Sequence, residues 1–160
     1  PVELTLREVG DGLRICAAPV REIELLYQQT SSIEARPIDP ETSADIPVSG
    51  GMYDAHLSVK VSTAAVIELV IHGVSVSYDV HREVLSCMDR EVALPINNGL
   101  LTVRVVVDRF SVEIFAADGM VYMPMRVNFD PAVDPLSVRA AGGAAFIESF
   151  TVHSLGSLSS

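Results

Sequence analysis

The chain has 160 residues and a formal net charge of −10, and 49% of its residues are hydrophobic. This length suits one domain with a real core, and the hydrophobic content is too high for a disordered protein. No run of about 18 uncharged apolar residues predicts a transmembrane helix. The acidic charge and the single lysine, Lys60, argue against nucleic acid or an anionic membrane as partners.

The first residues predict a β-hairpin. Apolar and polar residues alternate over 2–7 and 13–16, on either side of a Gly-Asp-Gly turn at 10–12. The chain starts with Pro1 and shows no signal-peptide pattern, so we expect a piece of a longer protein.

Two less regular segments follow the hairpin. Residues 19–27 could begin as a short helix after Pro19, but their apolar residues also fit a strand, and both alternatives stay open. Residues 28–51 contain Pro, Gly, Ser, Thr and Asp in abundance. They predict a long surface loop, which could include a little extended structure.

The rest of the chain predicts strands in close succession. Val, Ile and Thr make up 39 of the 160 residues, and β-branched side chains favour strands. The predicted strands cover 53–61, 65–71, 74–78, 84–88, 100–108, 111–116, 121–127, 136–140 and 144–155, with turns at 97–99 and 118–119. About ten strands without a long helix would not stay in one open sheet. We therefore expect one all-β domain over 1–160, a two-sheet antiparallel β-sandwich that is jelly-roll-like, of the concanavalin type.

Metal and cofactor chemistry has little support in the sequence. Cys16 and Cys87 form no C-x-x-C motif, so two buried free thiols are expected, although an exported protein could form one disulfide. The four histidines, His56, His72, His81 and His153, lie on separate segments without the spacing of zinc ligands. The Asp-Pro pairs at 130–131 and 134–135 predict turns, and the absence of an EF-hand pattern does not support calcium there. We expect no metal and no cofactor.

One segment, residues 105–119, stands out by its charges. Asp108 and Arg109 separate two apolar strands, and Glu113 interrupts an apolar run. A carboxylate buried at that position needs a partner. We expect Glu113 to point into the sandwich and to pair with Arg109 or Arg90.

Three motifs resemble glycoside hydrolase family 32, which contains invertases, levanases and inulinases. Val-Asp-Arg at 107–109, followed by Ser-Val-Glu-Ile-Phe at 111–115, is similar to the hallmark segment of the family's C-terminal β-sandwich domain. Residues 1–23 resemble the family's passage from the catalytic domain into the sandwich. Tyr-Asp at 78–79 and Asp-Arg at 89–90 resemble a further family pattern. The sequence departs from the family pattern mostly in residues 28–51 and at Phe110.

The resemblance implies a non-catalytic fragment. The family's active site lies in an N-terminal five-bladed propeller, and its nucleophile lies in a Trp-containing Asn-Asp-Pro-Asn motif. This chain has no Trp, and it also lacks the family's Arg-Asp-Pro and Glu-Cys motifs. We therefore expect the chain to be inert by itself and the parent protein to be a β-fructosidase.

Two functions from different classes follow from this resemblance. In the first, the sandwich packs on the catalytic propeller, stabilises it and could support a homodimer, while its charged motif residues form turns or internal ion pairs. In the second, it is a lectin-like module that binds fructan. The candidate carbohydrate-binding residues are Tyr78, Asp79, Asp89, Arg90, Asp108, Arg109 and Glu113. Tyr53, Tyr78 and Tyr122 are candidate stacking platforms, although packing within the sheet is the expected role of each.

An unrelated concanavalin-like lectin or glucanase would share the fold class, but the three ordered motifs argue against it.

Overall fold

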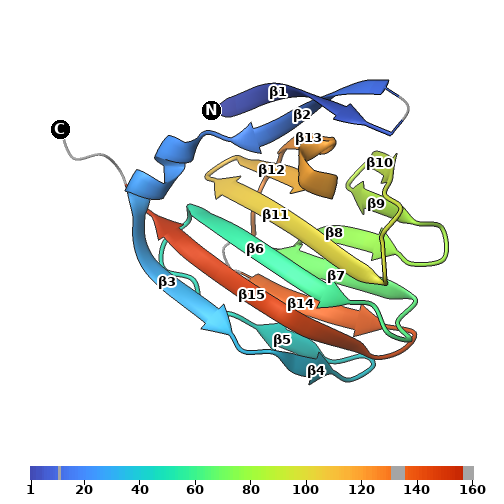
Figure 1. Cartoon of the computed structure of the whole chain (residues 1–160). Helices are drawn as coiled ribbons and strands as arrows, with labels where there is room; N and C mark the ends of the chain where they lie inside the picture. Colours follow the sequence, from blue (N-terminus) through green and yellow to red (C-terminus); the bar gives the residue numbers. More distant parts are fainter. Residues whose placement is uncertain (11, 131–135, 157–160) are drawn as a thin grey trace.

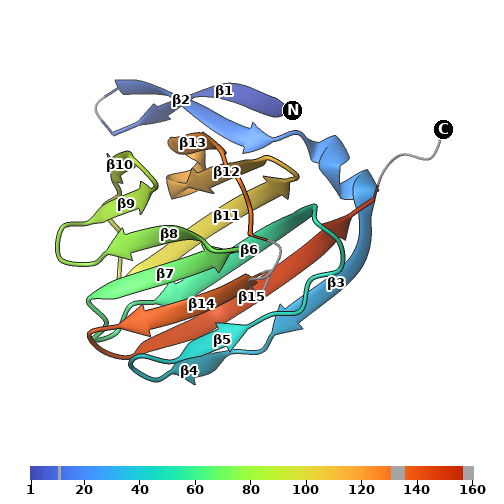
Figure 2. The ribbon, with the colours of Figure 1, turned by 180° about the vertical axis from the view of Figure 1, so that it is seen from behind.

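A computed structural model describes residues 1–10, 12–130 and 136–156 of the chain. Two antiparallel sheets pack against each other as a β-sandwich (Figures 1 and 2), which confirms the predicted fold class. The strands of the first half are β1 (Val2–Val9), β2 (Gly12–Pro19), β3 (Tyr27–Ile33), β4 (Arg36–Ile38), β5 (Ser43–Asp45), β6 (Tyr53–Lys60), β7 (Val66–Ile71) and β8 (Val74–Asp79). Those of the second half are β9 (Val84–Cys87), β10 (Arg90–Ala93), β11 (Leu100–Asp108), β12 (Ser111–Ala116), β13 (Val121–Arg126), β14 (Leu136–Ala141) and β15 (Ala145–Leu155). Two short 3-10 helices, η1 (Arg21–Leu26) and η2 (Ala117–Gly119), accompany them.

The strand order divides these elements into two layers. One sheet has the order β10-β9-β8-β7-β14-β5, and the other has the order β13-β12-β11-β6-β15-β3, with β4 paired to β15. The second is called the seven-stranded sheet below. Among the described residues, no helix is long and apolar enough to cross a membrane.

The core lies between the two sheets and follows the alternation of side chains along each strand. In β11, Val103, Val105 and Val107 are buried, whereas Thr102 and Arg104 lie on the outer face of the sheet. Because successive residues of a strand point to opposite faces, each inward Val packs in the core and each intervening position faces outward. The outer face therefore carries the polar side chains that are available for a site.

The segment 28–51 contains more strand than the sequence predicts. It includes β4 and β5 and nearly all of β3, which pairs with β15 in the register Phe150↔Ile33. β3 is an edge strand rich in Gln, Thr and Ser, so it lacks the apolar alternation by which strands are predicted. In the stretch 19–27, the structure has the short helix, since η1 covers residues 21–26 and only Tyr27 belongs to the strand β3.

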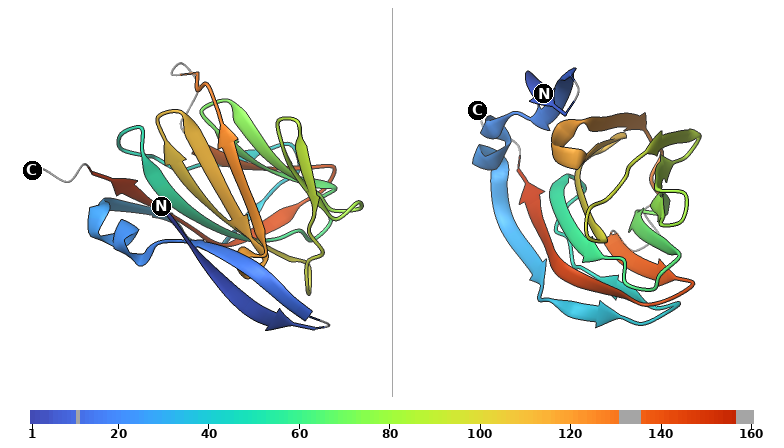
Figure 3. Two further views of the ribbon diagram at one scale, coloured as in Figure 1. Left: turned by 90° about the horizontal axis from the view of Figure 1, so that it is seen from above. Right: turned by 45° about the vertical axis from the view of Figure 1, so that its right-hand side comes forward.

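The hairpin β1-β2 forms as predicted but stands apart from both sheets (Figure 3). Its strand β2 approaches η2, where Gly119 has a positive φ of 87°. A Cβ atom at Gly119 would lie 2.3 Å from the backbone oxygen of Ala17. Only glycine allows this close approach of η2 to the hairpin.

Both cysteines are buried and unpaired, as the sequence predicts. Cys16 lies on β2 and Cys87 lies on β9, in different parts of the fold. Burial raises the pKa of the Cys87 thiol, which keeps it protonated and unreactive near neutral pH. The Asp-Pro turn at 134–135 and Pro131 lie outside the described residues.

Candidate functional site

The first pair of predicted site residues serves the structure of the sandwich. Tyr78 is buried in the core, and its hydroxyl donates a hydrogen bond of 2.9 Å to the backbone oxygen of Leu94. Asp79 ends β8, and its Oδ1 accepts hydrogen bonds from the backbone N–H groups of His81 (3.0 Å) and Arg82 (2.9 Å). These contacts fix the turn that follows the strand.

The remaining charged motif residues lie at two turns. Asp89 lies between β9 and β10, Arg90 is the first residue of β10, and both are exposed. Asp108 is the last residue of β11, Arg109 follows it, and both are exposed. Asp108 Oδ1 accepts a hydrogen bond of 2.7 Å from the Arg109 backbone N–H. The role of these residues in sugar binding stays a prediction.

The expectation that Glu113 points into the sandwich is wrong. Its neighbours Val112 and Ile114 are fully buried in the core, so Glu113 lies on the outer face of β12. There it accepts a hydrogen bond of 3.3 Å from the Tyr122 hydroxyl. Within the described residues, no ion pair joins Glu113 to Arg109 or Arg90.

The tyrosines proposed as stacking platforms divide into two groups. Tyr53 and Tyr78 are buried, as expected for residues that pack inside a sheet. Tyr122 is partly buried and stacks on Phe115 with a centroid distance of 5.0 Å. Tyr122 and Glu113 thus share the outer face of the seven-stranded sheet.

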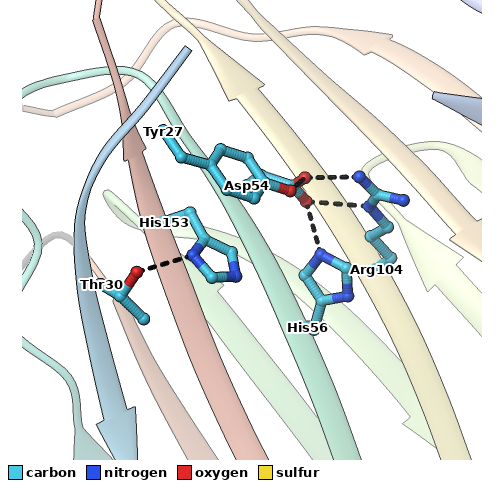
Figure 4. A network of polar contacts seen from close by, with 6 residues as sticks. All are labelled: Tyr27, Thr30, Asp54, His56, Arg104 and His153. Carbon is cyan, nitrogen blue, oxygen red and sulfur yellow. Dashed lines mark hydrogen bonds and ion pairs between the residues drawn. The ribbon is translucent and has the colours of Figure 1, made fainter. Parts of the chain in front are cut away.

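A polar network that the sequence did not reveal occupies this outer face (Figure 4). Its centre is Asp54 on β6, whose exposure is 0% although its side chain lies outside the core. The register aligns His153 of β15 and Val106 of β11 with Asp54. The next outward position of β6, His56, is paired with Arg104. Three adjacent strands therefore bring charged and imidazole groups together.

Three side chains surround the Asp54 carboxylate. Arg104 donates from Nε to Oδ1 at 3.0 Å and from Nη2 to Oδ2 at 2.6 Å. The Tyr27 hydroxyl donates to Oδ2 at 2.6 Å. The His56 Nε2 atom lies 3.2 Å from Oδ1, but this contact lacks hydrogen-bond geometry, and Nε2 has no hydrogen-bond partner among the described residues. The bidentate arginine pair is thus the main interaction.

The contacts determine the charge state of Asp54. Burial alone would raise the pKa of Asp54, but the contacts with His56, Arg104 and Tyr27 outweigh burial and hold this pKa well below its ordinary value. The carboxylate is ionised near neutral pH and its oxygens are occupied by protein donors. Asp54 is therefore suited to hold strands together and not to transfer protons to a substrate.

Two aromatic contacts extend the network to the edge strand β3. The Tyr27 and His153 rings stack with a centroid distance of 4.1 Å, and the Thr30 hydroxyl lies 2.9 Å from His153 Nδ1. The His56 and His153 rings meet edge to face at 5.9 Å. The network therefore attaches β3 to β15, β6 and β11.

Because two histidines have lowered pKa values in the folded chain, we expect acid to destabilise the fold. Burial lowers the pKa of His153, with a further contribution from His56, and burial also lowers the pKa of His72. Below pH 6.5, the ordinary histidine value, the unfolded chain binds more protons at these positions than the folded chain. The free energy of unfolding should thus fall as the pH falls through this value, as measured by urea denaturation between pH 7.5 and 5.

His153→Gln should flatten this pH dependence, because the variant removes one of the groups that bind protons on unfolding. His81→Gln is the matched control, since His81 is exposed in the turn after β8. An unchanged slope in His153→Gln would contradict the prediction.

A groove of about 620 Å³ opens next to the network. It lies between the hairpin and the outer face of the seven-stranded sheet, and Arg104 lines it. No three His, Cys, Asp or Glu side chains in the described part of the chain come together in a way that could hold a metal ion.

The family model for the C-terminal domain of glycosyl hydrolases family 32 matches residues 22–154. The chain belongs to this family. The predicted membership of glycoside hydrolase family 32 is thereby confirmed. The hairpin precedes the matched residues.

Known proteins agree with the family 32 assignment. The chain is 27% identical to levanase from Bacillus subtilis (strain 168) over 180 residues, which cover 97% of this chain and 26% of levanase. It shares its fold with exo-inulinase from Aspergillus awamori, with a TM-score of 0.74, 14% identity and coverage of 98% of this chain and 35% of that protein. Fructofuranosidase from Schwanniomyces occidentalis, in complex with fructose, also shares the fold, with a TM-score of 0.76 and 13% identity. The match covers 98% of this chain and 40% of that protein. This family 32 domain thus spans well under half the length of each of these relatives.

Proposed function

We propose that this chain is the non-catalytic C-terminal module of a β-fructosidase, and that it packs against the N-terminal catalytic domain of the same polypeptide and stabilises it. The family match supports the first part of this proposal, together with the 26% of levanase that the chain covers. One observation carries the second part. The hairpin β1-β2 exposes a continuous apolar face.

Four large aliphatic side chains form this apolar face: Leu4, Leu6, Leu13 and Ile15. They are 62–66% exposed, and the register of β1 and β2 places all of them on the same side of the hairpin. Monomeric soluble proteins rarely expose a contiguous cluster of such residues. Covering this face is therefore favourable.

The opposite face of the hairpin already has a partner. Cys16 on that face is buried, and Arg7 donates a hydrogen bond of 3.2 Å to the backbone oxygen of Asp118 in η2. The apolar face consequently points away from the sandwich and is open to another domain. Complete burial of one large aliphatic side chain stabilises a folded protein or complex by about 1.5–3 kcal/mol. Well over half of each of these four side chains is still exposed, so most of this stabilisation is left for a contact with another domain.

The test uses the complete polypeptide that contains this module. The double variant Leu6→Ser and Ile15→Ser should lower the melting temperature of the complete protein by several degrees, because less apolar area is buried between its domains. The isolated chain should melt as before, since both side chains are exposed there.

Leu25→Ser provides the matched control. Leu25 is 79% exposed on η1, outside the hairpin, and its replacement should leave the melting of the complete protein unchanged. Equal melting of the double variant and the parent protein would refute docking through the hairpin.

Fructan binding is the alternative function, and one surface feature favours it. A shallow hollow of about 420 Å³ is lined by Phe110, Glu113 and Arg126 among other residues. An exposed aromatic ring beside a carboxylate and a guanidinium suits sugar hydroxyls and sugar ring faces. Retention of the chain on a levan affinity gel would support this alternative.

A further inference from the structure

The larger groove, of about 620 Å³, has the size of a small-molecule site. Its polar lining comes from four elements that meet only in the folded chain: Arg7 on β1, Asn97 before β11, Thr102 and Arg104 on β11, and Asp118 in η2. None of these five residues belongs to the sites predicted from the sequence. The groove faces the polar side of the hairpin, opposite the apolar face proposed to meet the catalytic domain.

Several polar side chains in the groove have donors or acceptors that could hydrogen-bond a ligand. The structure gives no partner among the described residues to the Asp118 carboxylate or to the Asn97 side-chain amide. Arg104 uses Nε and Nη2 for Asp54, which leaves Nη1 for another acceptor. The Thr102 hydroxyl has only a long contact of 3.4 Å with Ser58. Donors and acceptors are therefore both available.

The charges of the groove favour a neutral ligand. Arg104 is neutralised by Asp54, which it binds through two hydrogen bonds. Arg7 and Asp118 both line the groove, where Arg7 donates to the Asp118 backbone oxygen, so one further positive and one further negative side chain lie there together. No net positive charge remains to attract an anion, and the whole chain carries a charge of −10.

Apolar side chains complete the lining. Ile96 and Met120 contribute aliphatic surface, and Met120 is itself exposed. A ligand that presents hydroxyl groups at its edges and C–H groups on its faces matches this mixture of donors, acceptors and apolar area. Carbohydrates have this chemistry.

We propose that the groove between the hairpin and the seven-stranded sheet binds a neutral carbohydrate chain. Asn97, Asp118 and Arg104 Nη1 hydrogen-bond its hydroxyl groups, and Ile96 and Met120 contact its ring faces. The choice of a fructose-based probe rests on the proposed function, whereas the site itself does not. Docking to the catalytic domain is measured by melting of the complete polypeptide, so the two proposals fail separately.

The test is a titration of the ¹⁵N-labelled chain with levan-derived oligosaccharides, followed by amide chemical shifts. The shifts should be centred on residues 96–104 and 117–120. Asp118→Asn combined with Asn97→Ala should weaken binding at least tenfold, because the Asp118 carboxylate becomes a weaker, uncharged acceptor and the Asn97 amide is removed. Asp89→Asn, on the β9-β10 turn, is the control and should bind like the parent chain.

Three results would overturn the proposal. Shifts centred on residues 108–113 would place the sugar at the hollow around Glu113. Shifts with inorganic phosphate but not with the oligosaccharide would show an anion site. No shifts with either probe would show that the groove binds neither ligand. An amide spectrum of the double variant that matches the parent confirms that lost binding is not lost folding.

Discussion

Replacing Asp54 by alanine should lower the free energy of unfolding by about 3 kcal/mol. The variant removes the only carboxylate of the network and leaves the Arg104 guanidinium without its bidentate partner. This value is the lower end of the range for broken buried pairs, because the Arg104 side chain is 25% exposed and regains some hydration. Tyr27 also loses the acceptor of its hydroxyl. Urea denaturation at pH 7 measures the change.

Two further variants separate the charge effect from packing. The double variant Asp54→Leu and Arg104→Met should be less destabilised than Asp54→Ala, since it leaves no unpaired charge. Glu91→Ala breaks the exposed pair between Arg82 and Glu91 and should leave the stability nearly unchanged. If Glu91→Ala and Asp54→Ala lose equal stability, burial is not what makes the Asp54 network strong.

Replacing Gly119 by alanine should detach the hairpin from η2. The new Cβ would lie 2.3 Å from the Ala17 backbone oxygen and 3.0 Å from its backbone nitrogen, and a backbone contact cannot relax by a change of rotamer. The positive φ adds strain, and we expect a loss of about 1–3 kcal/mol in total. Amide hydrogen exchange in β2 should become much faster, while exchange in β11 should stay slow.

Gly51→Ala is the matched control for this variant. A Cβ at Gly51 meets no atom within 4 Å. The control should therefore keep the stability and the exchange pattern of the parent chain. Slow exchange of β2 in Gly119→Ala would show that the hairpin tolerates the added methyl group and that the close approach is not required.

The elements that the sequence predicts well are those whose environment is regular. Val103, Val105 and Val107 alternate with outward positions, and this alternation is sufficient to place β11 on the core. Asn98 and Gly99 predict a turn, and both adopt positive φ in the structure. In these cases the local pattern and the fold agree.

The strand β3 and the burial of Asp54 were not predicted, and both have the same physical cause, which is contact between segments that are distant in the sequence. β3 has no apolar alternation and exists because β15, about 120 positions later, supplies its partners. Asp54 occupies an outward position that predicts exposure, and it is buried because Tyr27 and Arg104 reach it from β3 and β11. A single sequence contains no local signal for either event.

The inward orientation expected for Glu113 failed for a different reason. The outward position Phe115 is apolar, so the alternation of β12 is hidden within a run that looks buried on both sides. The fully buried Val112 and Ile114 reveal the true register. In the sequence, Ser111 and Glu113 alternate with Val112 and Ile114, and this alternation is the signal that indicates an outer position for Glu113.

The edge strand β13 limits how copies of this domain can associate. β13 carries Pro124, opposite Glu113, in the middle of the strand. Proline lacks a backbone N–H, and within sheets it is found where that position faces solvent and not a further strand. A neighbouring chain could not extend the sheet here with an unbroken ladder, so β13 is protected against edge-to-edge aggregation. A homodimer of this domain would have to use a surface other than this edge.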